Sequence, residues 1–420
     1  MTTMHPVSLS ADSIHTIIDS TLASLPSISL SGSSHHENLL LRRVKTPHDW
    51  NRVSYDLPRS HQSKRNEIED HCGNVVFSPD VRTPFYFGIQ AVCSDSSQHE
   101  EKLIGFCTFY IAYSTWDGRI LYVDQFNMET DHKILLYRIL AEIATQIHCE
   151  RFTWKQKERP EWDITTGQPE YLHDWVFLSM DREAMANFVG SPLTALSLCQ
   201  NPEEGNATKM KSLLFLYIED AIRETLVQQK LPKQSANIRL RLAGSEDTET
   251  ISRLVRLLAV YEKEPDAVNV TADDYFIDGY HSTEPLFYCI LADIVAADEE
   301  MEEEDGCDNT RPRITVAMGL FYFGHNLNDG PFLYLEDLFC EEAYRGKGIG
   351  TAIMKQLANI SLSLDCSQFI WTALDWNVPA LSFYKKIGAK MNNEAKITRY
   401  CGSDIQSFAR SGNQFTIQNR

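Results

Sequence analysis

Two long segments of the sequence read alike and lie about 210 residues apart. Each contains a pair of runs rich in aliphatic, aromatic and β-branched residues, at 103–110 and 120–126 in the first segment and at 317–323 and 332–339 in the second. An Asp-Gly turn separates the two runs of each pair. Such a pattern predicts a β-hairpin. The sequence therefore predicts an internal duplication, for which a chain of 420 residues has room.

Each copy continues with a helical pattern. In the second copy the apolar residues recur three or four positions apart, which places them on one helix face: Ile349, Ile353, Leu357, Ile360 and Leu364. A strand over 368–374 and a helix over 378–387 follow, and a long helix over 209–230 joins the copies. The fold class expected is therefore α/β, with mixed α+β sheets in two tandem domains.

Composition divides the chain further. The first 36 residues include ten serines, which predicts a disordered tail, although the apolar stretch 14–25 could form a helix on a partner. An acidic insert at 298–305 is expected to be a solvated loop, with steering of a cationic substrate as the alternative. The expected parts are a tail (1–36), a first domain (37–192), a helical linker (193–236), a second domain (237–410) and a flexible C-terminus (411–420).

The charge balance excludes several classes of function. With 39 basic and 58 acidic residues the net charge is −19, which repels nucleic acid and anionic membranes. No apolar run approaches the roughly 20 residues that span a bilayer, and no secretory signal is visible, so a cytoplasmic or nuclear location is expected. The ten cysteines lack paired spacing, which predicts reduced thiols, and the 13 histidines lack metal-ligand spacing, which predicts no metal.

One loop carries a chemical signal. It runs from Tyr344 to Gly350, between a predicted strand and the predicted helix, and contains three glycines. Glycines allow a tight turn whose N–H groups approach a ligand, and a helix N-terminus favours an anion such as pyrophosphate. The spacing excludes a P-loop and a dinucleotide-binding G-x-G-x-x-G motif. What remains is an R-x-x-G-x-G motif that follows a strand.

The run from 237 to about 408 resembles GNAT-type N-acetyltransferases, and among them the spermidine/spermine and thialysine acetyltransferases. Several motifs carry the resemblance in the family's order: 261–262, 278–280, 334–337, 344–350, 366–369, 374–377 and 383–389. The resemblance implies a tandem GNAT fold and acetyl-CoA as cosubstrate. It also implies a set of residues that bind this cosubstrate: Leu338, Phe339, Cys340, Arg345, Gly346, Lys347, Gly348, Ile349, Gly350, Thr351 and Asn377.

The chemistry requires a base and an acid. A lysine-like amine has a pKa near 10.4, so deprotonation at pH 7 costs roughly 4.5 kcal/mol. The resemblance makes Glu336 the candidate base and Tyr384 the candidate acid for the departing thiolate. It places Glu262, Asp337, Leu374 and Asp375 at the amine substrate. Direct transfer in a ternary complex needs no covalent nucleophile.

The two copies depart from the family pattern in different ways. Thialysine-type enzymes carry Tyr-Ser-Thr-Trp between the hairpin strands, where the second copy has 325–328 as His-Asn-Leu-Asn. The first copy keeps the family residues at 113–116 but has no glycine loop after its second hairpin strand. We therefore expect the first copy to be a degenerate GNAT domain without cofactor binding. It is expected to pack on the second copy as an intramolecular pseudo-dimer.

The function expected is acetyl transfer from acetyl-CoA to a primary amine of a polyamine or a lysine-like small molecule. The sequence leaves two alternatives open. One is a protein lysine or N-terminus as the acceptor, and the other is a non-catalytic scaffold that binds acetyl-CoA. It also leaves open whether the whole chain self-associates.

Overall fold

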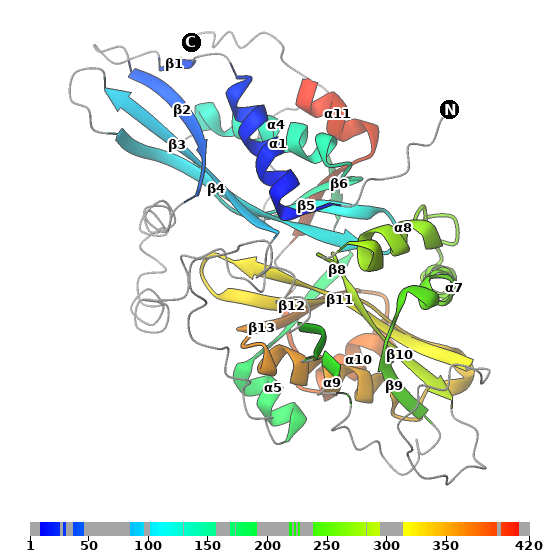
Figure 1. Cartoon of the computed structure of the whole chain (residues 1–420). Helices are drawn as coiled ribbons and strands as arrows, with labels where there is room; N and C mark the ends of the chain where they lie inside the picture. Colours follow the sequence, from blue (N-terminus) through cyan, green and yellow to red (C-terminus); the bar gives the residue numbers. More distant parts are fainter. Residues whose placement is uncertain are drawn as a thin grey trace.

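The computed structural model contains two β-sheets with helices on their outer faces (Figure 1). The described residues up to 190 are called the first half here, and those from 218 onward the second half. The acidic insert, the C-terminus 411–420 and most of the expected linker lie outside the described residues. The structure describes residues 9–25, 28–30, 37–45, 85–95, 101–128, 130–156, 169–172, 174–190, 218–220, 222–223, 226, 238–282, 284–294, 314–392 and 396–410.

The first sheet is mixed and contains the first predicted hairpin. β4 and β5 pair antiparallel across the turn at Gly118, and β5 then pairs parallel with β6. In spatial order its strands are β1 (Ile28–Leu30), β2 (Glu37–Arg43), β3 (Tyr86–Asp95), β4 (Glu101–Ser114), β5 (Gly118–Met128), β6 (Arg151–Gln156), β15 (Lys396–Cys401) and β7 (Glu170–Leu172).

The second sheet repeats this topology. β11 and β12 form the second predicted hairpin, and β12 pairs parallel with β13, whose observed bounds equal the predicted strand. Its strands, in spatial order, are β14 (Lys390–Asn392), β8 (Trp175–Asp181), β13 (Gln368–Leu374), β12 (Gly330–Cys340), β11 (Ile314–Asn326), β10 (Tyr288–Ile294) and β9 (Ile238–Leu242).

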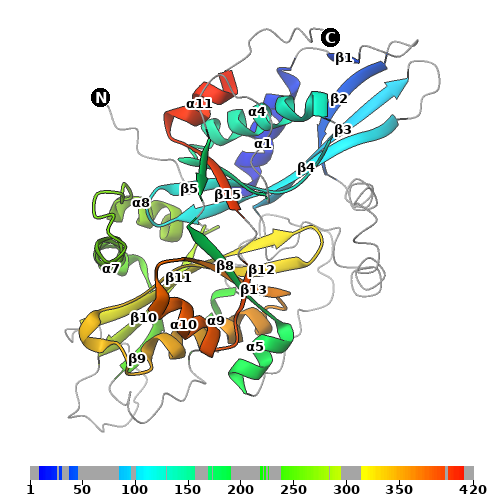
Figure 2. The same ribbon diagram turned by 180° about the vertical axis from the view of Figure 1, so that it is seen from behind.

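The two halves exchange their closing strands. β8 of the first half lies in the second sheet, between β13 and β14, whereas β15 of the second half lies in the first sheet, between β6 and β7. Figure 2 shows these two strands passing each other at the centre of the molecule. The expected domains 37–192 and 237–410 are therefore corrected, because neither sheet is complete without a strand from the other half.

The expected disordered tail is also corrected. Residues 11–23 form helix α1 (Ala11–Ala23), which packs on the first sheet with Ile14 and Ile18 completely buried. Because these two side chains are spaced four apart, they lie on one apolar face of the helix. The prediction of disorder relied on the serine-rich composition and not on this spacing. Ile218 and Ile222 of the expected linker are likewise helical and buried against the second sheet. Both segments are thus parts of the folded halves.

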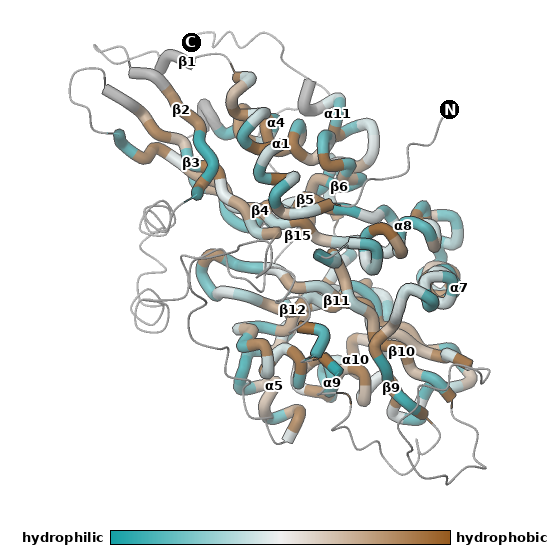
Figure 3. The backbone as a smooth tube through the Cα atoms, viewed as in Figure 1, coloured by the Kyte–Doolittle hydropathy of each residue, from teal (hydrophilic) through white to brown (hydrophobic). Residues whose placement is uncertain are grey.

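The remaining helices cover the sheets. Helix α9 contains the predicted apolar face, whose members from Ile349 to Leu364 are buried. Strand β10 is almost entirely hydrophobic in Figure 3, whereas the segment around α8 is largely hydrophilic. None of the described helices is long and apolar enough to cross a bilayer. The helices are α4 (Thr130–Gln146), α5 (Arg182–Val189), α7 (Thr248–Tyr261), α8 (Ala272–Phe276), α9 (Ile349–Ser363), α10 (Val378–Lys386) and α11 (Ser403–Arg410).

The halves differ most at the helix that follows the hairpin. In the second half α9 begins nine residues after β12 ends, and the intervening segment is the glycine loop. In the first half α4 begins two residues after β5 ends. An aromatic cluster fills the space between β5 and α4, since Phe126 stacks on Tyr137 with 4.4 Å between ring centroids and Tyr137 lies 5.1 Å from Trp154. The first half thus has no glycine loop, as its sequence predicts.

Candidate active site

The site lies where β12 and β13 separate. Their parallel ladder joins Phe332–Leu335 to Gln368–Trp371 and then stops, while both strands continue. A register shift between Leu320 and Phe321 leaves Glu336 as the extra residue on β12 at that point. Such a bulge bends a strand and redirects its side chains. The separation leaves the β12 backbone beyond Leu335 without a β13 partner, which makes it available to a ligand.

The glycine loop adjoins this opening. Gly346 and Gly348 adopt left-handed backbone angles, with φ of +76° and +86°, and Gly348 is the N-cap of α9 without a side-chain cap. The first N–H groups of α9 are therefore suited to an anion. The Arg345 guanidinium lies over the Tyr261 ring, and its Nε donates to the Cys340 carbonyl at 2.8 Å.

A cavity of about 1680 Å³ extends from this loop between the two halves. Most of the predicted site residues line this cavity. Lys347 and Asp375 are exposed and do not line it. Lys347 instead lies over the Tyr344 ring. The predicted residues in the wall are Glu262, Glu336, Asp337, Leu338, Phe339, Cys340, Arg345, Gly346, Gly348, Ile349, Gly350, Thr351, Leu374, Asn377 and Tyr384.

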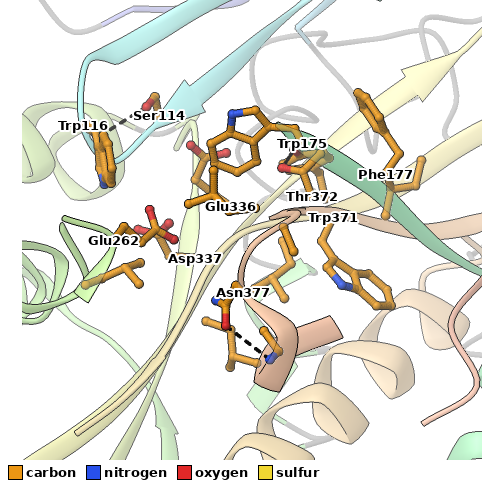
Figure 4. Close-up of a pocket in the computed structure, with 18 of the residues that line it drawn as sticks. Ser114, Trp116, Trp175, Phe177, Glu262, Glu336, Asp337, Trp371, Thr372 and Asn377 are labelled. Atoms are coloured by element: carbon orange, nitrogen blue, oxygen red, sulfur yellow. Dashed lines mark hydrogen bonds between the residues drawn. The ribbon is translucent and has the colours of Figure 1, made fainter. Parts of the chain in front are cut away.

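Three carboxyl groups from two elements meet in the cavity. Glu336 and Asp337 come from β12, and Glu262 follows α7. Figure 4 shows the Glu262 and Asp337 carboxylates together below Trp116, with Glu336 beside Trp175. Burial raises the pKa of all three carboxyl groups. The charge of Asp337 further raises the pKa values of Glu262 and Glu336, and the pKa of Glu262 is about 8. A cation entering the cavity would relieve this mutual repulsion.

The first half supplies the facing wall through its hairpin turn. The Thr115 hydroxyl donates to Asp337, with Oγ1 2.6 Å from Oδ2, and Ser114 hydrogen-bonds Glu336. The second half holds this turn in place, since the Tyr275 hydroxyl donates to the Thr115 carbonyl at 2.6 Å and the Asn269 N–H donates to the Trp116 carbonyl at 2.8 Å. The family-like residues at 113–116 therefore serve the site of the other half.

Sequence reasoning missed Ser114, Trp116 and Trp175 as site residues, although all three line the cavity. Trp175 arrives on the exchanged strand β8, beside Leu374 of β13. The available signal was the retention of the family's hairpin residues in a copy without a glycine loop. Combined with the pseudo-dimer hypothesis, this signal would have placed Ser114 and Trp116, but not Trp175, opposite Glu336.

Asn377 and Tyr384 belong to α10 and the turn before it. Asn377 is the N-cap of α10, because its Oδ1 accepts from the Ala380 N–H at 3.3 Å, and the same oxygen accepts from the Tyr261 hydroxyl at 3.1 Å. Its amide N–H₂ has no hydrogen-bond partner among the described residues and is available to a ligand. Tyr384 is buried against Trp371, and burial together with the charges of Glu262 and Asp337 raises the pKa of its phenol. The phenol therefore stays protonated at neutral pH.

The corresponding bulge of the first half also borders the cavity, but protein groups occupy its carboxylate. Asp124 is the extra residue there, at the register shift between Thr108 and Phe109. Its carboxylate accepts from the Tyr86 hydroxyl at 3.0 Å and, in the second-half hairpin, from the Asn326 amide at 2.7 Å and the Leu327 N–H at 2.9 Å. This carboxylate is saturated by protein donors, whereas Glu336 faces open space.

Comparison with known proteins supports this asymmetry. Residues 266–389 match the model of the acetyltransferase (GNAT) family. These residues lie wholly within the second half. The thialysine N-epsilon-acetyltransferase of Sus scrofa is 37% identical over 161 residues, which are 38% of this chain and 89% of that protein. The spermidine/spermine N(1)-acetyltransferase-like protein 1 of Homo sapiens is 32% identical over 150 residues, 36% of this chain and 20% of that protein. The L-ornithine N5-acetyltransferase of Arabidopsis thaliana is 35% identical over 74 residues, 18% of this chain and 32% of that protein.

Proposed function

Because this chain belongs to the acetyltransferase (GNAT) family, we propose that it transfers an acetyl group from acetyl-CoA to a primary amine of a polyamine or a lysine-like small molecule. The transfer is direct, within a ternary complex. The observation that carries the proposal is the meeting of an uncapped, glycine-rich helix N-terminus with three carboxyl groups, one buried and two half-buried, in one cavity. The first feature suits a pyrophosphate and the second suits an ammonium group.

The residues present fit acetyl-CoA. The N–H groups from Gly346 to Thr351 would hold the pyrophosphate, and the backbone of Leu338, Phe339 and Cys340 would pair with the pantetheine arm along the open edge of β12. The Asn377 amide would donate to the same arm. A backbone N–H aimed at the thioester carbonyl is worth on the order of 3 kcal/mol in the transition state.

The carboxyl groups prepare the amine. An incoming ammonium group would be attracted by Glu262 and Asp337 once both are ionised, and Glu336 would accept its proton, directly or through a water molecule. The raised pKa of Glu336 makes it a stronger base than an exposed carboxylate. Its position between Ser114 and Asp337 restrains it near the opening of the strands.

The transfer then exchanges one bond for another. The neutral amine nitrogen attacks the thioester carbonyl carbon, the new C–N bond forms as the C–S bond breaks, and the electron pair of the C–S bond stays on sulfur. Tyr384 supplies the proton that the thiolate takes. Glu336 holds the first proton, which the ammonium group lost before the attack, and the second proton, which the nitrogen loses as the amide forms, returns to the Tyr384 phenolate directly or through water. Burial, the largest cause of the raised Tyr384 pKa, keeps the phenol protonated until the thiolate forms.

The first half completes this site in the proposal. The matching strand order of the first half, and an Asp124 carboxylate whose oxygens accept from protein donors, support a degenerate copy of the same fold. The exchanged strands make the pair an intramolecular pseudo-dimer, in which one half binds acetyl-CoA and the other contributes Ser114, Thr115, Trp116 and Trp175 to the amine side.

The test is a panel of amines and basic peptides incubated with acetyl-CoA and the full chain, with release of free thiol as the readout. We expect turnover of small amines, and a fall of kcat by at least tenfold in Tyr384→Phe and Glu336→Gln with intact thermal unfolding. Turnover of peptides alone would favour a protein acceptor. Binding of acetyl-CoA by calorimetry without thiol release for any acceptor would favour a scaffold.

A further inference from the structure

The first sheet presents a group of basic side chains to the cavity. Alternate residues of β6 face it, and two of these are Arg151 and Lys155. Arg399 of β15 also lines the cavity, and its register partner on β6 is Thr153, which lies midway between the other two. Arg151, Lys155 and Arg399 therefore form one compact group, called the basic stripe below. It faces the same cavity as Glu262, Glu336 and Asp337.

The stripe has hydrogen-bonding capacity left. Arg151 forms an ion pair with Asp117, but its buried Nε has no hydrogen-bond partner. Arg399 pairs with Glu170 at 2.7 Å. Lys155 lies over the Phe177 ring at 4.5 Å, and the charge of Asp124 acts on it, although the described residues include no carboxylate in an ion pair with it. The wall thus combines the guanidinium and ammonium groups of the stripe with the carboxylates of Asp117 and Glu170. A ligand that carries both a carboxylate and an ammonium group would fit it.

The stripe is close to the acidic side of the cavity. The charge of Arg151 lowers the pKa values of both Glu336 and Asp337 against the effect of burial, so these groups sense one another. A polyamine carries no carboxylate that could pair with the guanidinium and ammonium groups of the stripe. A substrate with an amine at one end and a carboxylate at the other would be attracted at both.

The stripe exists in one half only. By their places in the parallel ladders, β6 residues 151, 153 and 155 correspond to β13 residues 368, 370 and 372. These three residues of the second sheet are Gln368, Ile370 and Thr372, which carry no charge. Charge therefore distinguishes the wall that faces the transfer site from its counterpart.

We propose that the basic stripe binds the carboxylate of the amine substrate, which is then an amino acid with a second amine on its side chain. This inference rests on the proposed function and narrows it. Asp117 and Glu170 accept the α-ammonium group of such a substrate, and the side-chain amine extends toward Glu336. The half without the glycine loop thereby selects the substrate, and Arg151, Lys155 and Arg399 are specificity-determining residues.

The test compares L-lysine with L-lysinamide, which keeps both amines but lacks the carboxylate, and with spermidine. Free thiol release by the full chain gives kcat/KM for each. We expect lysine to exceed lysinamide by at least tenfold. The double variant Arg151→Gln, Lys155→Gln should bring this ratio close to one by raising KM for lysine, while lysinamide changes little. The matched control is Arg182→Gln, a half-exposed arginine of α5 paired with Asp365, which should leave the ratio unchanged.

The outcomes separate this inference from the proposed function. Turnover of lysinamide or spermidine at least as fast as that of lysine, or a ratio that the double variant leaves unchanged, overturns the carboxylate site but not acetyl transfer. Failure of every amine to release thiol overturns both. Lysinamide carries more positive charge than lysine, so loss of the two cations acting at long range would speed the turnover of lysinamide. Loss of a carboxylate contact would instead raise KM for lysine and leave lysinamide nearly unchanged.

Discussion

The hydroxyl of Thr115, in the first half, donates a hydrogen bond to the carboxylate of Asp337, in the second half, across 2.6 Å in a buried position. The bond joins the turn of one hairpin to the transfer site of the other sheet. It also opposes the effect of burial, because a donor to an ionised carboxylate lowers its pKa. One hydroxyl thus links the packing of the halves to the protonation of the site.

Replacing Thr115 by valine keeps the shape of the side chain and removes this donor. We expect the pKa of Asp337 to rise, so the acidic limb of the pH profile of kcat/KM should move to higher pH, with a loss of about tenfold near neutral pH. Thr115→Ser, which retains the donor, should restore the wild-type profile. A fall in activity with an unshifted limb would mean that the hydrogen bond has only a structural role.

The exchanged strands predict that neither half folds alone. A chain that begins at residue 191 loses β8, so β13 and β14 lose the strand that joins them, and β15 loses its partners β6 and β7. We expect this fragment to lack a cooperative thermal transition and to be inactive. As a control, the chain is divided between residues 190 and 218 and the two fragments are produced together. We expect the pair to recover the fold and the activity. A stable, active second-half fragment would contradict this.

The pattern of each hairpin and of α9 was readable from the sequence, because hairpin turns and helix faces depend on residues close together in the chain. The strand exchange was not. The alternation of β8 shows which of its faces is buried but says nothing about which sheet it joins. For the same reason Trp175 could not be assigned to the site. Asp375 was expected there, but its neighbours Leu374 and Trp376 line the cavity and Asp375 does not. The tail was mispredicted because composition outweighed the spacing of Ile14 and Ile18.

Substituting Gly348 tests the anion site. Its φ of +86° disfavours any L side chain, at a cost of roughly 1–2 kcal/mol. We expect Gly348→Ala to raise KM for acetyl-CoA more than tenfold, because the displaced backbone no longer aims its N–H groups. The matched control is Gly190→Ala, at the C-cap of α5, which has the same φ and open space around an added Cβ. It should cost similar stability while leaving KM for acetyl-CoA unchanged.

The raised pKa of Glu262 predicts a dependence of stability on pH. Burial and the charge of Asp337 raise this pKa from the model-compound value of 4.5 to about 8 in the folded chain. Its contribution is therefore fully present below about pH 4.5 and is lost as the pH rises through 8. We expect Glu262→Gln to lose less Tm than wild type between pH 6 and 9. A saturating diamine should reduce that loss in wild type, because a bound cation stabilises the ionised carboxylate. Parallel Tm curves for both proteins would contradict the assignment.

Arg119 and Asp278 form a buried ion pair between the halves, with only 3% and 5% of their side chains exposed and two guanidinium nitrogens within 3.0 Å of one carboxylate oxygen. Removing one partner leaves an uncompensated buried charge, so Arg119→Met should lower the free energy of unfolding by about 3–5 kcal/mol. The double variant Arg119→Met, Asp278→Leu leaves no such charge and should recover part of this loss. Denaturant unfolding of the single and double variants measures the coupling. A double variant as unstable as the sum of the single variants would show that the two charges act independently.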